Sequence, residues 1–315
     1  MLMNIIQIVD TEKSAIAILA RQIKRHNPDL NIKTAAFHPK KPDKNQIDNV
    51  HNLLKWADII DCQYWKSGNK VKEMMPELWH SKPKMLTHYN PYNLHEQKWT
   101  EYKKVVVVNN YQKSELPQAE LIPLAIDQKF FTFNKDYCQQ PVVNMTIARI
   151  ESKKGCLEVA EACNQLKYLF ILVGRISDDS YFKKTIAAGG KFINYRGNIN
   201  DPLVRSSYYE SAIHVCNSID GFESGTMPVL EAMSCGVPVV SRLVGHVPDI
   251  YNGNNMVIHE GKQEDIEGIK TILKTLMEDK DKRLKMRALA AESIKGRTDI
   301  WRAGEYANAY KKVMI

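Results

Sequence analysis

Short apolar runs alternate along the chain with segments in which apolar residues recur every three or four positions. The second spacing is that of a helix with one buried face. In the first part of the chain the apolar runs lie at 4–9, 32–37, 59–62, 84–87 and 103–108, and helices are expected at 14–26 and 45–56. Repeated β-α-β units produce this alternation and build a parallel sheet. The pattern predicts an α/β lobe.

A second unit of the same kind follows a stretch without a sustained period. Residues 116–141 are rich in Pro, Gln and aromatic residues, which indicates a linker. Beyond it, strands are expected at 142–148, 168–173, 191–195, 213–216 and 237–241, and helices at 155–166, 203–211, 228–234, 264–285 and 300–314. We therefore expect two Rossmann-like, doubly wound lobes, over 1–140 and 141–299.

The composition places the chain among ordinary globular proteins. It has 315 residues, of which 44% are hydrophobic and 25% charged. Its apolar runs are too short to span a bilayer and its start lacks the marks of a secretory leader, so we expect a cytoplasmic protein. Its 6 cysteines show no metal-binding spacing, which predicts reduced thiols and no metal site.

The chain carries an excess of positive charge. Lys and Arg number 44 against 36 Asp and Glu, giving a formal charge of +8. Residues 1–140 contribute 20 basic and 15 acidic side chains, and residues 141–315 contribute 24 and 21. The excess favours anionic partners such as nucleotides, nucleic acids or acidic membranes, and it leans towards the first lobe.

Residues 221–249 contain the most informative chemistry. Two carboxylates, Glu223 and Glu231, lie on either side of a glycine-containing turn and a helix that begins with a proline. Glu231 can accept hydrogen bonds from a vicinal diol, or it can simply stabilise the helix start, and Glu223 can be a surface charge. At such a helix start, backbone groups are available for hydroxyl or phosphate oxygens. The turn and first helical residues concerned are Gly225, Thr226, Met227 and Pro228.

This segment resembles the nucleotide-sugar site of retaining glycosyltransferases of the family-4 group, which have the two-lobed GT-B fold. The family pattern is Glu, seven residues, Glu, then Ala-Met-x-Cys/Ala-Gly-x-Pro-Val. The matching residues here are Glu223, Glu231, Ala232, Met233, Cys235, Gly236, Pro238 and Val239. The resemblance implies an α/β fold whose two Rossmann-like lobes face a cleft, with residues 300–315 returning to the first lobe.

The resemblance extends to residues upstream. ARIESKKG places Arg149 at a strand end and Lys154 just before a helix, where the two cations can clamp a diphosphate. The alternative is two solvated surface cations. Gly174 in LVGR, and Asn198 and Ile199 in YRGNIN, resemble the donor-binding loops of the family.

The first lobe departs from the family pattern. The loop VDTEKSA lacks the usual glycine pair, so its backbone cannot approach a phosphate as closely. His88, after the strand at 84–87, is the candidate to orient the reacting sugar, or else a structural histidine. Tyr64 and Trp65 can stack on an acceptor sugar or be buried aromatics. Three further residues can contact the acceptor or cap the following helix: Asp10, Thr11 and Ser14.

The resemblance implies a glycosyltransferase that moves a sugar from a UDP-, GDP- or ADP-sugar to a hydroxyl of a glycan or lipid-linked glycan, with retention. No metal or cofactor is expected, because Arg149 and Lys154 would meet the charge on the leaving diphosphate. The residues expected to be catalytic are Glu223, Arg149, Lys154 and His88. A lipid-linked acceptor would bring the protein to the inner face of a membrane.

Other readings of the chain stay open. Enzymes of the same fold with inverting or epimerase chemistry would share the donor lobe. An enzyme that glycosylates nucleic-acid bases, or a nucleotide-binding protein without catalysis, would also use the positive charge. The sequence has no helix-turn-helix, zinc or RNP-like signature for nucleic acid.

Overall fold

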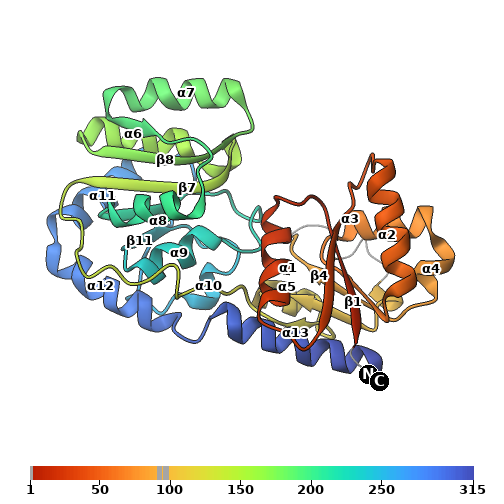
Figure 1. The fold of residues 1–315 in the computed structure, drawn as a ribbon. Helices are drawn as coiled ribbons and strands as arrows, with labels where there is room; N and C mark the ends of the chain where they lie inside the picture. Colours follow the sequence, from red (N-terminus) through yellow and green to blue (C-terminus); the bar gives the residue numbers. More distant parts are fainter. Residues whose placement is uncertain (1–2, 91–93, 95–98) are drawn as a thin grey trace. The chain divides into compact units, whose positions relative to one another are not determined.

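The computed structural model describes residues 3–90, 94 and 99–315. The chain forms two compact units, one made of residues 1–125 and 297–315 and the other of residues 126–296 (Figure 1). Both are α/β units with a parallel sheet, as predicted, and each sheet has six strands where five were expected. In the part of the chain that the structure describes, no helix is long and apolar enough to cross a membrane.

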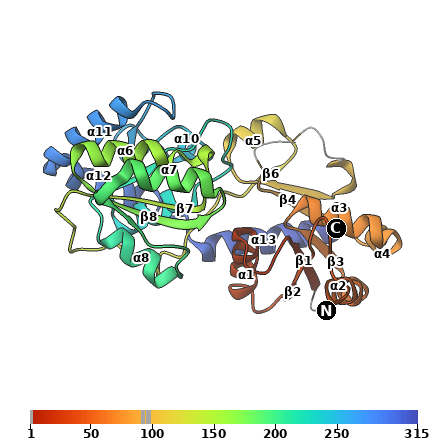
Figure 2. The same cartoon turned by 90° about the horizontal axis from the view of Figure 1, so that it is seen from above.

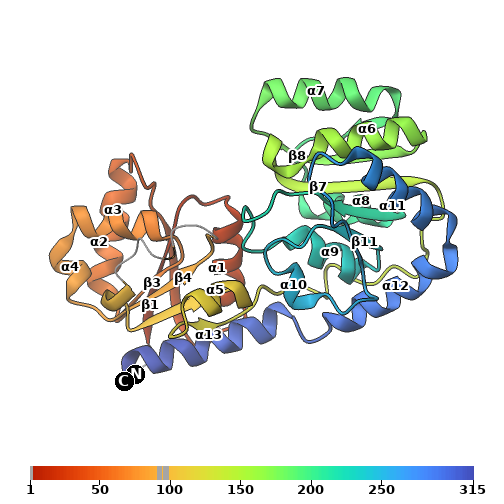
Figure 3. The same cartoon turned by 180° about the vertical axis from the view of Figure 1, so that it is seen from behind.

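The sheet of the first unit has the strand order β2-β1-β3-β4-β5-β6. Its strands are β1 (Asn4–Val9), β2 (Asn31–Ala36), β3 (Ile59–Cys62), β4 (Lys84–His88), β5 (Lys104–Val107) and β6 (Glu120–Leu121). Its α-helices are α1 (Ala15–Arg25), α2 (Lys44–Trp56), α3 (Trp65–Met74), α4 (Pro76–His80), α5 (Asn110–Glu115) and α13 (Asp299–Met314). The C-terminal helix α13 returns to this unit, as predicted, and Figure 3 shows it running along the sheet.

Alternate residues of the strands feed two cores, because successive side chains in a strand point to opposite faces. Ile6 and Ile8 pack on the face covered by α2, α3 and α4. Ile5 and Ile59 pack on the face covered by α1 and α13.

A buried polar network ties α13 to the sheet. Asp61, in β3, is fully buried and accepts a hydrogen bond from the Tyr310 hydroxyl at 2.5 Å. It also accepts from Gln63 Nε2 at 2.9 and 2.7 Å. A second hydroxyl on α13, that of Tyr306, lies 3.0 Å from Thr87 Oγ1 in β4. The return of α13 is therefore held by specific polar contacts as well as by apolar packing.

The sheet of the second unit has the order β12-β11-β10-β7-β8-β9. Its strands are β7 (Val142–Ile150), β8 (Leu169–Ile176), β9 (Ile193–Tyr195), β10 (Ile213–Cys216), β11 (Val239–Ser241) and β12 (Val257–Ile258). Its α-helices are α6 (Cys156–Leu166), α7 (Asp179–Gly189), α8 (Asp201–Tyr209), α9 (Met227–Cys235), α10 (Val247–Ile250), α11 (Ile266–Glu278) and α12 (Lys280–Ser293). Figure 2 shows α6 and α7 on one side of this sheet and α8 on the other.

The division between the units differs from the predicted 140/141 boundary, because residues 126–141 pack on the second unit. The Phe131 ring lies edge-on to Tyr208, with centroids 6.3 Å apart. The Tyr137 hydroxyl donates to the carbonyl of Ala212 at 2.7 Å, and Asn134 N donates to Cys235 O at 3.0 Å. The aromatic residues that suggested a linker instead anchor this segment.

The predicted helix at 264–285 is two helices. Asp279 ends α11, and its side chain accepts from Lys282 N at 2.8 Å to cap α12. A side-chain cap of this kind offers the backbone an alternative to continuing the first helix.

Candidate functional site

The candidate donor site lies in the second unit, where the carboxyl ends of parallel strands meet. Ligands of doubly wound sheets bind at this edge. The register between β7 and β8 shifts between Thr146 and Arg149. At the shift a Cβ on Gly174 would lie 2.5 Å from Ile147 O, so only glycine allows this approach. This close approach explains why glycine occupies position 174, where the sequence analysis expected a donor-binding residue.

Gly155 fixes the position of Lys154. It has φ +67°, and a Cβ there would lie 2.5 Å from both the carbonyl oxygen and Nδ2 of Asn217. Asn217 Nδ2 in turn donates to Gly155 O at 3.3 Å. This tight approach pins the start of α6 against the loop that follows β10.

Lys154 and Glu223 form an ion pair across these loops. Lys154 Nζ donates to Glu223 Oε1, which also accepts from Ser218 Oγ at 2.7 Å. Their side chains are only 12% and 11% exposed. The Phe222 ring centroid lies 5.1 Å from Lys154 Nζ. The structure therefore joins two predicted catalytic residues that are far apart in sequence, and it adds Ser218 and Phe222, which the sequence analysis missed.

Arg149 lies on the strand leading to this site but has a different partner. Its side chain is 46% exposed and pairs with Glu151 at 3.2 Å. Its register partner on β8 is Arg175, which is also exposed. Two like charges in register on neighbouring strands repel each other, and an anion between them would remove that cost. Arg175 was missed, although it stands directly after Gly174 in the quoted motif.

Gly245 packs closely against the turn that precedes α9. Gly245 has φ +57°, and a Cβ there would lie 3.0 Å from Gly225 N and 3.1 Å from Glu223 Cβ. Thr226 is buried, with its hydroxyl 3.5 Å from His246 Nε2, and it does not cap α9 through its side chain. The Thr226 side chain therefore does not cap the start of α9, which was predicted to bind oxygen ligands. Pro228 lies in the first turn of this helix.

Glu231 has an acid–base property that the sequence did not reveal. It accepts a hydrogen bond from the buried Tyr208 hydroxyl at 2.7 Å. Burial raises the pKa of Glu231 to about 7, although the bond from Tyr208 opposes that rise. Its charge therefore changes in the neutral pH range.

Asn198 and Ile199, which the family resemblance places in a donor-binding loop at the nucleotide base, differ in environment. Asn198 is exposed, next to Gly197 with its φ of +80°. Ile199 is partly buried and packs against an apolar cluster on the sheet that includes Val142 and Ile171. Their contact with a base stays a prediction.

The candidate residues of the first unit have structural roles that are now visible. Ser14 caps α1 by accepting from Ala17 N at 3.1 Å, and its hydroxyl donates to Asp10 Oδ1. The Thr11 carbonyl is a weaker acceptor for the same hydroxyl, at 3.3 Å. The capping alternative thus describes this loop, and an acceptor role for these three residues stays a prediction.

Aromatic candidates in this unit are partly or wholly buried. His88 is fully buried in β4, and its ring lies edge-on to Trp99 with centroids 5.3 Å apart. Trp65 packs against the core beneath α2 and α3, while Tyr64 precedes α3 and is half-buried. Sugar contacts by these residues also stay predictions.

No cluster of three or more His, Cys, Asp or Glu that could hold a metal occurs among residues 3–90, 94 and 99–315. The one Asp-x-Asp triplet, at 279–281, lies at the junction of α11 and α12, where Asp279 is committed to capping.

Comparison with known proteins gives a family and a fold. Residues 129–293, more than half of the chain, match the family model described as Glycosyl transferases group 1. No curated protein sequence matches the chain. Sucrose-phosphate synthase from Thermosynechococcus elongatus is similar in structure, with a TM-score of 0.80 and 14% identity over 99% of both chains.

Two further solved structures are similar. HepE from Anabaena, solved with UDP and glucose, has a TM-score of 0.79 and 14% identity over 98% of this chain and 99% of its own. TarM from S. aureus, solved as a mutant with fondaparinux, alpha-GlcNAc-glycerol and UDP, has a TM-score of 0.69 and 15% identity over 88% of this chain and 61% of its own. At these identities the likeness concerns the fold, which is the two-lobed GT-B fold.

Proposed function

This chain belongs to the Glycosyl transferases group 1 family and is a glycosyltransferase, and we propose that its donor is a nucleoside diphosphate sugar. The proposed acceptor is a hydroxyl of a glycan or lipid-linked glycan, and the proposed reaction retains the anomeric configuration without a metal. The similar structures HepE and TarM were solved with UDP, which supports a nucleotide donor here.

The observation that carries this proposal is the largely shielded ion pair of Lys154 and Glu223. An ammonium and a carboxylate in a weakly solvated site can each hold a different part of a nucleotide sugar. We assign the diphosphate to Lys154, with Arg149 at the exposed side, and the sugar hydroxyls to Glu223. In the structure the two groups neutralise each other, so that neither charge is left weakly solvated and unpaired.

In the proposed reaction the bond between the anomeric carbon and the β-phosphate oxygen breaks, and its electron pair stays on that oxygen. The acceptor oxygen forms the new bond on the same face of the sugar. Its proton goes to the β-phosphate, so no external base or oxidant is needed. Lys154 and Arg149 stabilise the charge that develops on the diphosphate.

Lys154→Ala and Glu223→Gln should each reduce transfer by at least a hundredfold while the chain stays folded. Matched controls are Lys184→Ala and Glu278→Gln, which change exposed residues on α7 and α11. A thermal-shift screen with UDP-, GDP- and ADP-sugars identifies the donor, and turnover is then measured with that donor. Wild-type turnover in either site variant would overturn the assignment.

The anomeric configuration of the product, read by NMR, tests retention. An inverted product would favour the inverting alternative. Activity that is unchanged after extensive treatment with a chelator is expected if no metal takes part.

We further propose a cytoplasmic location with peripheral membrane contact when the acceptor is lipid-linked. The support is the excess of positive charge, because anionic lipids attract basic protein surfaces. Sedimentation with phosphatidylglycerol vesicles at low and high salt tests this, and equal binding at both salt concentrations would contradict an electrostatic contact.

A further inference from the structure

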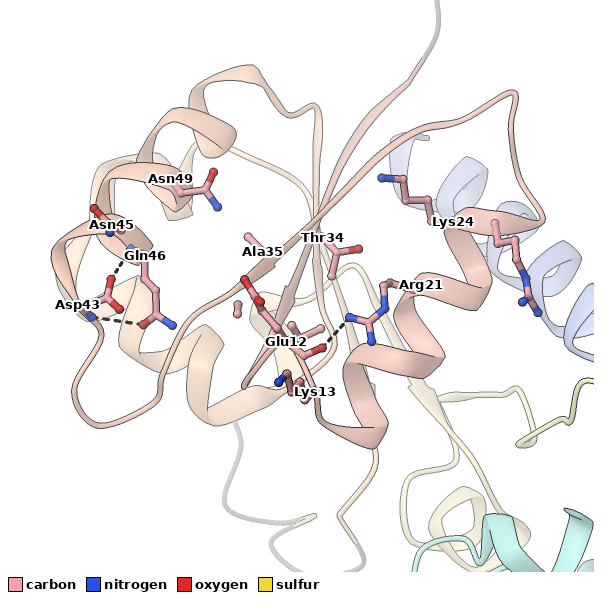
Figure 4. A pocket seen from close by; sticks show the side chains of 13 residues that line it. Glu12, Lys13, Arg21, Lys24, Thr34, Ala35, Asp43, Asn45, Gln46 and Asn49 are labelled. Atoms are coloured by element: carbon pink, nitrogen blue, oxygen red, sulfur yellow. Dashed lines mark hydrogen bonds between the residues drawn. The ribbon is translucent and has the colours of Figure 1, made fainter. Parts of the chain in front are cut away.

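Side chains of α1, β2 and α2 line a hollow of about 1010 Å³ in the first unit (Figure 4). It lies along β2, the edge strand of the sheet. The strand order reverses elsewhere, between β1 and β3, which is the usual ligand position in such sheets. None of the acceptor residues predicted from the sequence lines the hollow. It therefore needs an explanation of its own.

One wall of the hollow is cationic. Arg21, Lys24 and Arg25 share a stripe on α1, since they stand three and four residues apart. Helix α1 contains no acidic residue that would offset them. Lys13, from the loop before the helix, lines the same hollow.

Most of this charge is not neutralised within the unit. Arg25 pairs with Asp299 at 2.5 Å, whereas Arg21 donates to the backbone carbonyl of Glu12 at 2.7 Å. Within the described residues, no carboxylate pairs with Lys13, Arg21 or Lys24. Like charges on one helix face repel each other, and a bound anion would remove that cost.

The opposite wall is polar and mostly uncharged. Asn45, Gln46 and Asn49 line it from α2, and Figure 4 shows them across β2 from the cations. Carboxamides both donate and accept hydrogen bonds, as sugar hydroxyls do. Val9 and Ala35 also line the hollow, but both are almost completely buried, so the polar side chains provide its accessible surface.

The two acidic side chains that line the hollow fit the same kind of ligand. Asp43 is committed to capping α2, where its carboxylate accepts from Gln46 N at 2.8 Å. The Glu12 carboxylate would repel a bare anion but can accept from sugar hydroxyls. Because the hollow is concave, a flat bilayer surface could not reach Asn45, Gln46 and Asn49.

We propose that this hollow binds an acidic saccharide, a sugar chain that bears phosphate, sulfate or carboxylate groups, and that this saccharide is part of the acceptor. The anionic groups would face Lys13, Arg21 and Lys24, and the hydroxyls would face Asn45 and Asn49. The acceptor role of this saccharide rests on the proposed function, whereas its binding does not, because binding does not require transfer.

The test is titration calorimetry of the full chain with three tetrasaccharides. A sulfated heparin tetrasaccharide supplies sulfate together with carboxylate groups, a galacturonic acid tetramer supplies carboxylates alone, and maltotetraose is the neutral control. The variant carries Lys13→Gln, Arg21→Gln and Lys24→Gln. A matched variant carries Lys55→Gln, Lys103→Gln and Lys311→Gln, three exposed lysines of the same unit that do not line the hollow.

We expect at least one anionic tetrasaccharide to bind, with an affinity that falls at high salt. The hollow variant should lose at least tenfold in affinity, and the matched variant should stay within twofold of the wild type. Binding of the galacturonic acid tetramer would show that carboxylates suffice, and binding of the heparin tetrasaccharide alone would show that sulfate groups are needed. An added Asn45→Ala, Asn49→Ala variant should weaken binding further, because a saccharide uses both walls.

The proposal is overturned if maltotetraose binds as tightly as the anionic ligands, if neither anionic ligand binds, or if both triple variants lose affinity equally. It is also overturned if phosphatidylglycerol vesicles bind through the hollow residues while the tetrasaccharides do not. Thermal shifts with UDP on the same proteins keep the two proposals separate. A hollow variant that still responds to UDP isolates the saccharide site, and a wild type that ignores every nucleotide sugar refutes the donor assignment alone.

Discussion

Replacing Asp61 with asparagine should flatten the pH dependence of the stability of the first unit. Asp61 is fully buried, and desolvation raises its pKa from 3.8 to about 6, against the lowering effect of the hydrogen bonds from Tyr310 and Gln63. The folded protein therefore holds this proton more tightly than the unfolded chain does.

The sign of the effect follows from that difference. A raised pKa contributes stability that is complete below about pH 4 and is lost as the pH rises through 6. At 1.36 kcal/mol for each tenfold change in proton affinity, the rise in pKa from 3.8 to about 6 corresponds to about 3 kcal/mol. Asparagine does not titrate. The free energy of unfolding of the wild type, minus that of Asp61→Asn, should therefore fall by about 2–3 kcal/mol between pH 4 and pH 7.

The chain provides a selective assay for this unit. All 5 tryptophans, at positions 56, 65, 79, 99 and 301, belong to the first unit. Tryptophan emission during urea unfolding therefore reports on that unit alone. Tyr306→Phe is the control, because its hydroxyl contacts Thr87 and Arg302 and makes no hydrogen bond to Asp61. The control should lose a similar amount of stability at every pH. A difference between wild type and Asp61→Asn that is constant with pH, or that grows as pH rises, would refute the reasoning.

Two other predictions concern the second unit. UDP affinity should weaken as the pH falls from 8 to 6, because a proton on Glu231 removes an acceptor for ribose hydroxyls. Tyr208→Phe should raise the pH at the midpoint of this change, because it removes the hydrogen bond that lowers the pKa of Glu231. Titration calorimetry across pH checks this, with Glu231→Gln as the flat control, and a wild-type affinity without pH dependence would contradict it. Gly155→Ala should destabilise the unit by about 2–4 kcal/mol, because residue 155 has a left-handed backbone and its new Cβ would lie 2.5 Å from Asn217 O. Gly197→Ala should cost about 1 kcal/mol, because residue 197 is also left-handed but has no atom within 4 Å of the new Cβ. Far-UV circular dichroism during urea unfolding measures both, and equal losses would contradict the steric argument.

Local patterns were sufficient for most of the fold. The ranges 4–9 and 59–62 coincide with β1 and β3, and the other predicted strands fall within a few residues of the observed ones. Periodicity reports which side chains face a core, and it does so wherever an element has one buried face. Periodicity did not predict α3, α4, α5, α7, α10, β6 or β12. It also failed for 126–141 and for the break at Asp279, where single contacts and a cap outweigh the hydrophobic pattern.

The sequence provided candidate site residues but not the contacts between them. The motif identified Lys154, Glu223 and Glu231 as candidates, because a motif is defined by the spacing of residues along the sequence. It did not show that Lys154 pairs with Glu223, or that Tyr208 holds Glu231. Those contacts join residues more than twenty positions apart, and they depend on the strand order that brings distant loops to one edge.

The charge of the first lobe shows the same division. By itself the sequence determined that residues 1–140 carry five more basic than acidic side chains. Helical spacing in the predicted helix at 14–26 already puts Arg21 and Lys24 on one face. Only the tertiary structure decided that Lys13 and side chains of α2 line the same hollow, because they come from other segments of the chain. Charge is a property of composition, whereas a binding site requires those charges to converge on one point in space.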